Sequence, residues 1–238
     1  MLSKKTEKQD KNYLILSINR MILAEPIFLS LQWEWPHTWM PSIFVRFYWC
    51  NLCCKWCDSL YAVNNPESII NTTVDEVVKE IKKLNCHNIV FTGGEPTLFH
   101  KDIQEIQDKL WRDNYTWEIE TNGSTPIRNK FHQINISPKL SNSWNEPYKL
   151  QALNELPLYA VYPISICFKF VAKTKKDCKE IQKYIKENDL RHDWIYIMPE
   201  WTDYESQLNT EVLQFCLDNE YRYCQRMHII LFGNKKWV

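Results

Sequence analysis

Residues 45–59 read VRFYWCNLCCKWCDS, and this stretch decides how the rest of the chain is interpreted. Cys50, Cys54 and Cys57 follow a C-x3-C-x2-C spacing, which places three thiols on one short loop. Four cysteines are the usual ligand set of an iron-sulfur cluster or of a structural zinc site. A set of three therefore indicates a metal centre that keeps one coordination position open for another ligand.

The segment before this loop, SIFVRFYW at residues 42–49, is rich in β-branched and aromatic residues and predicts a β-strand. The cysteine loop then follows the carboxyl end of that strand. Active sites of α/β barrels and open α/β sheets lie at this end of their strands.

Strand and helix patterns alternate through the remainder of the chain. Thr73 with Glu76 three residues later forms a capping box that predicts a helix start. Further helices are predicted at 102–112, 175–187 and 206–219, and strands at 88–92, 116–120, 133–136, 165–171, 194–198 and 227–232. Repeated strand-helix units predict a parallel sheet with right-handed crossovers.

Composition narrows the class of protein. The chain has 238 residues, enough for one α/β domain with a large core, and its formal net charge of zero argues against a nucleic-acid partner. No apolar run approaches the roughly 18 residues of a membrane span. The nine cysteines are odd in number and cluster locally, which favours the reducing cytoplasm over a secreted disulfide scaffold. Residues 1–25 are expected to be a partly disordered lead-in.

Several short motifs, taken with the cysteine loop, resemble the 7-carboxy-7-deazaguanine synthases of the radical S-adenosylmethionine (SAM) superfamily. They are Q-x-E at 32–34, TGGEP at 92–96, ETNG at 120–123, SPK at 137–139, MPE at 198–200 and RMHIILFGNKKWV at 226–238. The matches extend from about residue 26 to the last residue. The resemblance implies one domain over 26–238, an incomplete, roughly six-stranded parallel (β/α) barrel.

The same resemblance implies the cofactors and where they bind. Cys50, Cys54 and Cys57 would hold a [4Fe-4S] cluster, SAM would chelate the fourth iron, and Ser59 would coordinate Mg²⁺. Contacts to the cluster and SAM are expected from Trp56, Asp58, Gly93, Gly94, Glu95, Glu120, Asn122, Ser137, Pro138, Lys139, Met198 and Pro199. Read without the resemblance, the Gly-Gly pair is a turn and a lysine is most often solvated.

The implied reaction is ring contraction of 6-carboxy-5,6,7,8-tetrahydropterin to 7-carboxy-7-deazaguanine with loss of ammonia. A flavodoxin- or ferredoxin-like electron donor and a homodimer are implied too. The substrate would contact Gln32, Trp33, Glu34, Arg46, Thr92, His228 and the terminal Val238. For Arg46 the alternative is a structural salt bridge, and for His228 a core histidine.

Two other functions stay open at this point. A glycyl-radical activase of the same superfamily has the same cysteine loop but docks a protein substrate. A zinc-binding module would use the four clustered cysteines, Cys53 included, although Cys53 breaks the x3 spacing and is interpreted as a bystander. The five cysteines outside the loop are expected to be buried thiols.

Tryptophan and glycine numbers are anomalous. The chain has 11 tryptophans and 4 glycines, where average usage predicts roughly 17 glycines. Seven tryptophans stand where the resembling family has glycine: Trp33, Trp35, Trp39, Trp49, Trp144, Trp201 and Trp237. We hypothesise that UGA codons, which the source organism reads as glycine, were translated here as tryptophan. If these tryptophans are real, a folded barrel with a blocked substrate pocket is expected.

Overall fold

The computed structural model describes residues 21–34, 36–60, 69–155, 164–200 and 208–233. Over these ranges the strands form one mixed sheet with the order β10-β9-β8-β7-β6-β5-β3-β1-β4, and β2 also pairs with β3. The strands are β1 (Met21–Leu23), β2 (Phe28–Leu31), β3 (Pro41–Phe47), β4 (Ile70–Thr72), β5 (Asn88–Gly93), β6 (Thr116–Thr121), β7 (Gln133–Ile136), β8 (Ser165–Ala172), β9 (Ile195–Pro199) and β10 (Arg222–Tyr223).

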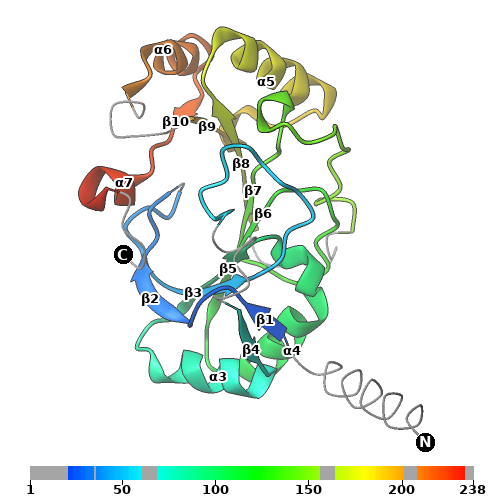
Figure 1. The fold of residues 1–238 in the computed structure, drawn as a ribbon, viewed down its shortest axis with the longest axis vertical. Coiled ribbons are helices and arrows are strands. Elements are labelled where there is room, and N and C mark those ends of the chain that lie inside the picture. The colour runs from blue at the N-terminus through cyan, green and yellow to red at the C-terminus, as the bar shows by residue number, and fades with distance from the viewer. Residues whose placement is uncertain (1–20, 35, 61–68, 156–163, 201–207, 234–238) are drawn as a thin grey trace, which may run out of the picture.

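Pairing is parallel from β3 through β5 to β10 and antiparallel for β1, β2 and β4. The strands follow a curved path whose two ends do not pair among the described residues (Figure 1). An incomplete parallel (β/α) barrel, as expected from the sequence, is confirmed.

Helices cover the outer side of this curved sheet. They are α3 (Val74–Lys83), α4 (His100–Leu110), α5 (Lys175–Glu187) and α6 (Thr210–Asn219), with short 3₁₀ turns η2 (Pro96–Phe99), η3 (Ser141–Ser143) and η4 (His192–Trp194). Figure 1 shows these helices outside the arc of strands, while the cyan segment that carries the cysteines crosses the inner side. The Thr73–Glu76 capping box is present, with the Glu76 carboxylate accepting from Thr73 N at 2.8 Å.

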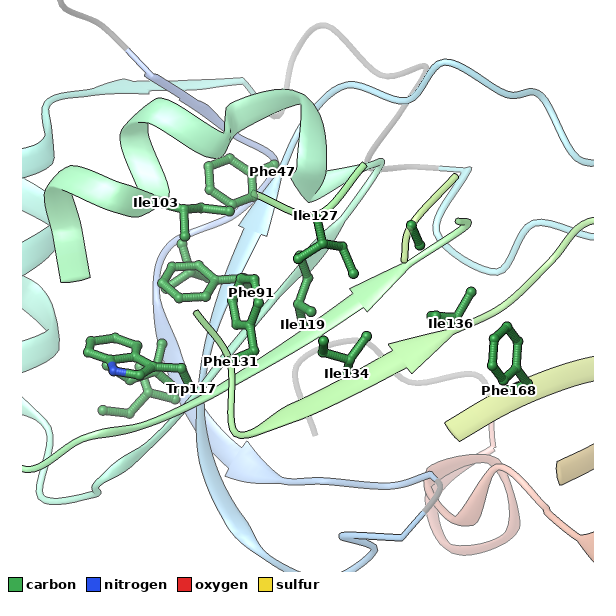
Figure 2. Close-up of a cluster of buried hydrophobic side chains, with 14 of the residues drawn as sticks. Phe47, Phe91, Ile103, Trp117, Ile119, Ile127, Phe131, Ile134, Ile136 and Phe168 are labelled. Carbon is green, nitrogen blue, oxygen red and sulfur yellow. The ribbon is translucent and has the colours of Figure 1, made fainter. Parts of the chain in front are cut away.

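Alternation along each parallel strand separates the core from the site. Successive side chains of a strand point to opposite faces, so on β3 the apolar Ile43, Val45 and Phe47 join the core, whereas Phe44 and Arg46 face the inside of the barrel. The later strands repeat this pattern. Figure 2 shows the resulting cluster of Phe47, Phe91, Ile103, Trp117, Ile119, Ile127, Phe131, Ile134, Ile136 and Phe168.

One predicted strand is wrong. Residues Met227–Phe232 form helix α7, not a closing strand. A six-residue apolar run fits either structure when judged by its pattern alone. The short β10, which the sequence analysis did not predict, takes the edge position beside β9 instead. Sheet pairing begins at Met21, within the apolar residues 13–32, which the sequence predicts to form a strand pair or a strand with its approach.

Candidate functional site

The carboxyl ends of the parallel strands open into one cavity of about 280 Å³. The cysteine loop follows β3, the glycine pair ends β5, and the SPK motif follows β7. Eighteen predicted site residues line this cavity: Gln32, Trp33, Glu34, Arg46, Cys50, Cys54, Trp56, Cys57, Asp58, Ser59, Thr92, Gly93, Gly94, Glu120, Asn122, Ser137, Lys139 and His228. Glu95, Pro138, Met198 and Pro199 do not line it, and Val238 lies outside the described residues.

Gly93, the last residue of β5, and Gly94 let the end of β5 pack closely against the end of β3. Gly93 has φ +124°, and a Cβ on it would lie 2.2 Å from the carbonyl oxygen of Phe47. A Cβ on Gly94 would lie 2.0 Å from the carbonyl oxygen of Trp49. Because only glycine avoids both overlaps, the pair holds the start of the cysteine loop beside the end of β5.

Glu95 is fully buried and acts within the protein. Its two carboxylate oxygens accept hydrogen bonds from Thr97 N at 3.0 Å, Thr121 Oγ1 at 2.7 Å and Asn122 N at 2.7 Å. These bonds join the end of β5 to the end of β6. The arrangement makes Glu95 a support for Asn122, which does line the cavity.

Cys50, Cys53, Cys54 and Cys57 all line the cavity. Cys53 is exposed, whereas the other three are partly buried. Burial raises the pKa of Cys50 and of Cys57 to about 11. As free thiols they are therefore protonated near neutral pH, and metal ligation is what would remove their protons. Over the described ranges, no three His, Cys, Asp or Glu side chains are placed to ligate a single ion.

Lys139 reaches the cavity from the end of β7. Its Nζ atom donates to Ser137 Oγ at 2.7 Å and lies 5.1 Å from the centre of the Trp56 ring. Burial lowers its pKa from the usual lysine value. A partly desolvated ammonium beside three sulfurs can attract a carboxylate or thiolate ligand strongly.

A four-residue ion network forms another part of the lining and reaches the cysteine loop through Asp58. Glu34 contacts Lys169 Nζ with one oxygen and Arg226 Nε with the other, the latter at 3.1 Å. Arg226 also contacts Asp58 Oδ2 at 3.2 Å. Burial alone would raise the pKa of Glu34, but Lys169 and Arg226 outweigh it and lower that pKa to about 2. Glu34 is thus a carboxylate throughout the physiological range.

Gln32, Glu120 and Thr92 form a second polar group. Gln32 Nε2 donates to Glu120 Oε1 at 3.0 Å, and Thr92 Oγ1 donates to Glu120 Oε2 at 2.7 Å. Burial raises the pKa of Glu120. Behind it lies Glu118, whose carboxylate meets His37 Nδ1 at 2.9 Å. The side chain of Glu118 also accepts from Asn135.

Arg46 and His228 have different surroundings. Arg46 donates through Nε to the buried Glu25. The Nε side of its guanidinium is therefore used in the structural salt bridge that the sequence analysis gave as the alternative to substrate binding. Burial lowers the pKa of His228, which keeps the imidazole neutral. Its Nδ1 atom is buried and has no hydrogen-bond partner among the described residues. A buried polar atom without a partner in a cavity wall is placed to bind a ligand.

Five polar residues of this region were missed by sequence reasoning: Glu25, Glu118, Asn135, Lys169 and Arg226. All five are buried. Arg226 directly precedes α7. A signal did exist for those on strands. Glu118, Asn135 and Lys169 each stand between two core residues, where a polar side chain must face the inside of the barrel.

The tryptophans that stand at expected glycine positions do not share one conformation. Trp39 has φ 76° and Trp144 has φ 64°, both in the left-handed region that favours glycine. Trp33 and Trp49 have ordinary φ values, as do the four tryptophans with no expected glycine. Trp35, Trp201 and Trp237 lie outside the described residues. Two of the four describable positions thus have glycine-like backbones.

Comparisons with known proteins bear on the family and on the fold. Residues 44–137, which include the cysteine loop, the glycine pair and the first residue of the SPK motif, match the model of the radical SAM superfamily. The structure of QueE from Escherichia coli has the same fold, with a TM-score of 0.66 at 20% identity, and the match covers 88% of this chain and 95% of that one.

Similarity to individual proteins extends over nearly the whole chain. A 7-carboxy-7-deazaguanine synthase of Rhodopirellula baltica is 29% identical over 229 residues, which covers 90% of this chain and 88% of the relative. The enzyme of the same name from Halobacterium salinarum is also 29% identical and covers 87% and 89%. That of Haemophilus influenzae is 42% identical over 113 residues, 48% of this chain and 51% of the relative.

In the parts of the chain that the structure describes, no helix combines the length and apolarity needed to cross a bilayer.

Proposed function

We propose that this protein is a radical SAM 7-carboxy-7-deazaguanine synthase, which contracts the ring of 6-carboxy-5,6,7,8-tetrahydropterin with loss of ammonia. The observation that carries the proposal is a cavity lined both by the three cysteines and by a group of polar and charged side chains. Relatives with this name match over nine tenths of the chain. When bound at the three cysteines, the [4Fe-4S] cluster and SAM supply a 5′-deoxyadenosyl radical that abstracts hydrogen from the substrate.

The donor set fits these groups. Three thiols on one loop leave one iron for SAM, and Lys139 supports binding of the SAM carboxylate by its charge. Gly94 lets the start of the cysteine loop lie against the end of β5. The zinc-module alternative needs a fourth ligand from the loop, and the fourth cysteine there, Cys53, is exposed.

The group of polar and charged side chains in the cavity lining suits a pterin. Gln32, Glu34 and Glu120 present acceptors and a donor to the amide and amine edge of the ring. Arg46 attracts the substrate carboxylate, and the neutral His228 contributes its unpartnered Nδ1. A buried, polar, small-molecule cavity is a better match to this substrate than to the protein substrate of a glycyl-radical activase.

Mg²⁺ is proposed at Ser59, whose hydroxyl donates to Asp58 Oδ1 at 3.3 Å beside the cavity. Magnesium takes few protein oxygens and keeps waters or substrate oxygens as its other ligands. Titration of activity with Mg²⁺ after chelation tests this site. A homodimer and a flavodoxin- or ferredoxin-like electron donor belong to the same proposal, and light scattering of the purified chain tests the first.

The deciding experiment is an anaerobic assay with SAM, dithionite and the pterin, run on reconstituted protein with glycine at the seven tryptophan positions. We expect 7-carboxy-7-deazaguanine and ammonia in equal amounts. Cys53→Ala and Cys54→Ala form a matched pair on adjacent residues. The first should keep the brown cluster and the activity, and the second should lose both.

Two results would overturn the proposal. One is a colourless protein that binds zinc, and the other is a reconstituted, SAM-cleaving protein that leaves the pterin unchanged. Turnover by the chain with its literal tryptophans would refute the narrower expectation that Trp33 and its neighbours block the pocket.

A further inference from the structure

Residues Ser141–Asn145, which follow β7, contact the cysteine loop at several points. The amide of Lys55 donates to the carbonyl of Ser143 at 3.0 Å. The indole Nε1 of Trp56 donates to the carbonyl of Asn142 at 3.1 Å. Segments that lie more than 80 residues apart in the chain are thereby held together. Residues 141–145 do not line the cavity themselves but hold the loop that does, and no motif predicted this contact.

Asn145 makes the contact that bears on chemistry. Its Nδ2 atom donates to the sulfur of Cys54 at 3.2 Å, and its Oδ1 atom accepts from the backbone N–H of Cys53 at 2.9 Å. The second bond sets the orientation of the amide, because only the oxygen can accept. With the oxygen held by Cys53, the NH₂ group must face the sulfur of Cys54.

The backbone at residue 144 directs Asn145 to this place. Trp144 is the C-cap of η3 and has φ 64°, a left-handed turn that reverses the chain immediately before Asn145. A glycine at 144 would adopt this turn without strain. The contact between Asn145 and Cys54 is therefore compatible with both the tryptophan and the glycine form of the chain.

Asn122 is a useful contrast on the other side of the loop. Its Nδ2 atom lies 3.9 Å from the sulfur of Cys50, and its better acceptor is Asn51 Oδ1 at 3.0 Å. Among the described side chains, Asn145 thus makes the shorter of these two amide contacts to a loop sulfur. Asn145 Nδ2 also donates to Ser143 Oγ at 3.1 Å, and its two N–H bonds can serve both acceptors. The backbone N–H of Leu52 donates to the sulfur of Cys50 at 3.4 Å, so Asn145 is of interest as a side-chain donor to Cys54.

We propose that Asn145 is a positioning residue that acts through Cys54 and raises the reduction potential of the cluster. The inference rests on the proposed function, because it requires the cluster at the three cysteines. A reduced cluster carries one more electron, and its sulfurs are stronger acceptors. A fixed N–H donor therefore stabilises the reduced state more than the oxidised one, as hydrogen bonds to cluster sulfurs do in general.

Two substitutions separate this role from a purely structural one. Asn145→Asp keeps an oxygen for the Cys53 N–H and so keeps the loop anchored, but it removes the donor to Cys54. Asn145→Ala removes both. Glu146→Gln is the control, because Glu146 is the next residue and is exposed, and its substitution changes a local charge without changing any bond to a loop sulfur.

The measurement is the midpoint potential of the full-length, anaerobically reconstituted chain without SAM, followed by electron paramagnetic resonance during titration with dithionite and mediators. We expect both Asn145 variants to be harder to reduce. A tenfold fall in the equilibrium constant for this one-electron step corresponds to about 59 mV. Glu146→Gln should move the potential much less. Iron content per chain is measured on every sample.

Each outcome decides the question. Potentials that fall for both Asn145 variants at normal iron content support the proposal. Normal iron content with an unchanged potential overturns it, and so does loss of the cluster from both variants, since Asn145 would then be only a structural anchor. An unmodified chain that takes up no cluster overturns the proposed function itself, which separates that failure from this one.

Discussion

Trp144→Gly and Trp111→Gly form a matched pair that tests the glycine hypothesis on the folded protein. The two side chains are alike in their surroundings. Trp144 is 73% exposed and Trp111 is 69% exposed. Each has a cation over its ring, Lys55 at 4.1 Å and Arg112 at 5.0 Å. They differ in backbone, because Trp144 has φ 64° and Trp111 has φ −59° at the end of α4.

The magnitude follows from that difference. Both substitutions remove an exposed cation–π contact of about 0.5–1 kcal/mol and both add the flexibility of glycine to the unfolded chain. These shared effects cancel when the two variants are compared. A non-glycine residue in the left-handed region costs roughly 1–2 kcal/mol, and only Trp144→Gly removes this cost. We expect Trp144→Gly to be the more stable variant by about that amount.

Thermal unfolding of the two variants, measured under identical anaerobic conditions, provides the assay. For a protein of this size, 1 kcal/mol shifts Tm by roughly 2–4 °C. Trp144→Gly should therefore melt about 2–8 °C above Trp111→Gly. Equal melting temperatures, or a lower one for Trp144→Gly, would refute the backbone argument. The gene offers an independent check, since the hypothesis requires UGA at Trp144 and at Trp39 but UGG at Trp111.

Three further predictions concern the site and its supports. Gly94→Ala places a Cβ 2.0 Å from the Trp49 carbonyl oxygen and should lower both Tm and iron uptake, whereas Gly233→Ala, with no atom within 4 Å, should cost only backbone strain. Lys169→Met should raise the pKa of Glu34 from about 2 and thereby raise the pH at which acid destabilises the fold. The stability that the ionised Glu34 contributes is present above its unfolded pKa of 4.5 and is lost as pH falls through its folded pKa, which acid titration monitored by circular dichroism measures. The hydrogen bond to Glu118 raises the pKa of His37, so the stability that protonated His37 contributes is complete below pH 6.5 and is lost as pH rises through its folded pKa. His37→Gln should remove this pH dependence of Tm from melting curves taken across neutral pH, and a Tm profile equal to that of the unmodified chain would contradict the prediction.

Local sequence patterns were sufficient to predict most of the helices and strands. The β-branched run before Cys50, the Thr73 capping box and the apolar stripes of α4 and α5 each act over a few residues, so a short window of sequence predicts them. The cysteine spacing likewise places three thiols on one loop. These features predicted a parallel sheet and the place of its site, whereas the incomplete barrel was implied by the family resemblance.

The failure at Met227–Phe232 has a physical reason. A run of six apolar residues has too few positions to separate a helix from a strand. Its state depends on neighbours that are distant in sequence, and the amide of Met227 donates to the carbonyl of Trp33 at 3.1 Å. Helix α7 is therefore decided by docking and not by propensity.

The partners inside the barrel depended on the tertiary structure in the same way. Lys169 meets Glu34 across 135 positions, and Asn145 meets Cys54 across 91. The residue types alone showed that polar groups occupy inward strand positions and that three thiols share a loop. Which carboxylate each cation faces, and which sulfur receives an amide, follow from the register and curvature of the sheet, because these bring the ends of non-adjacent segments together.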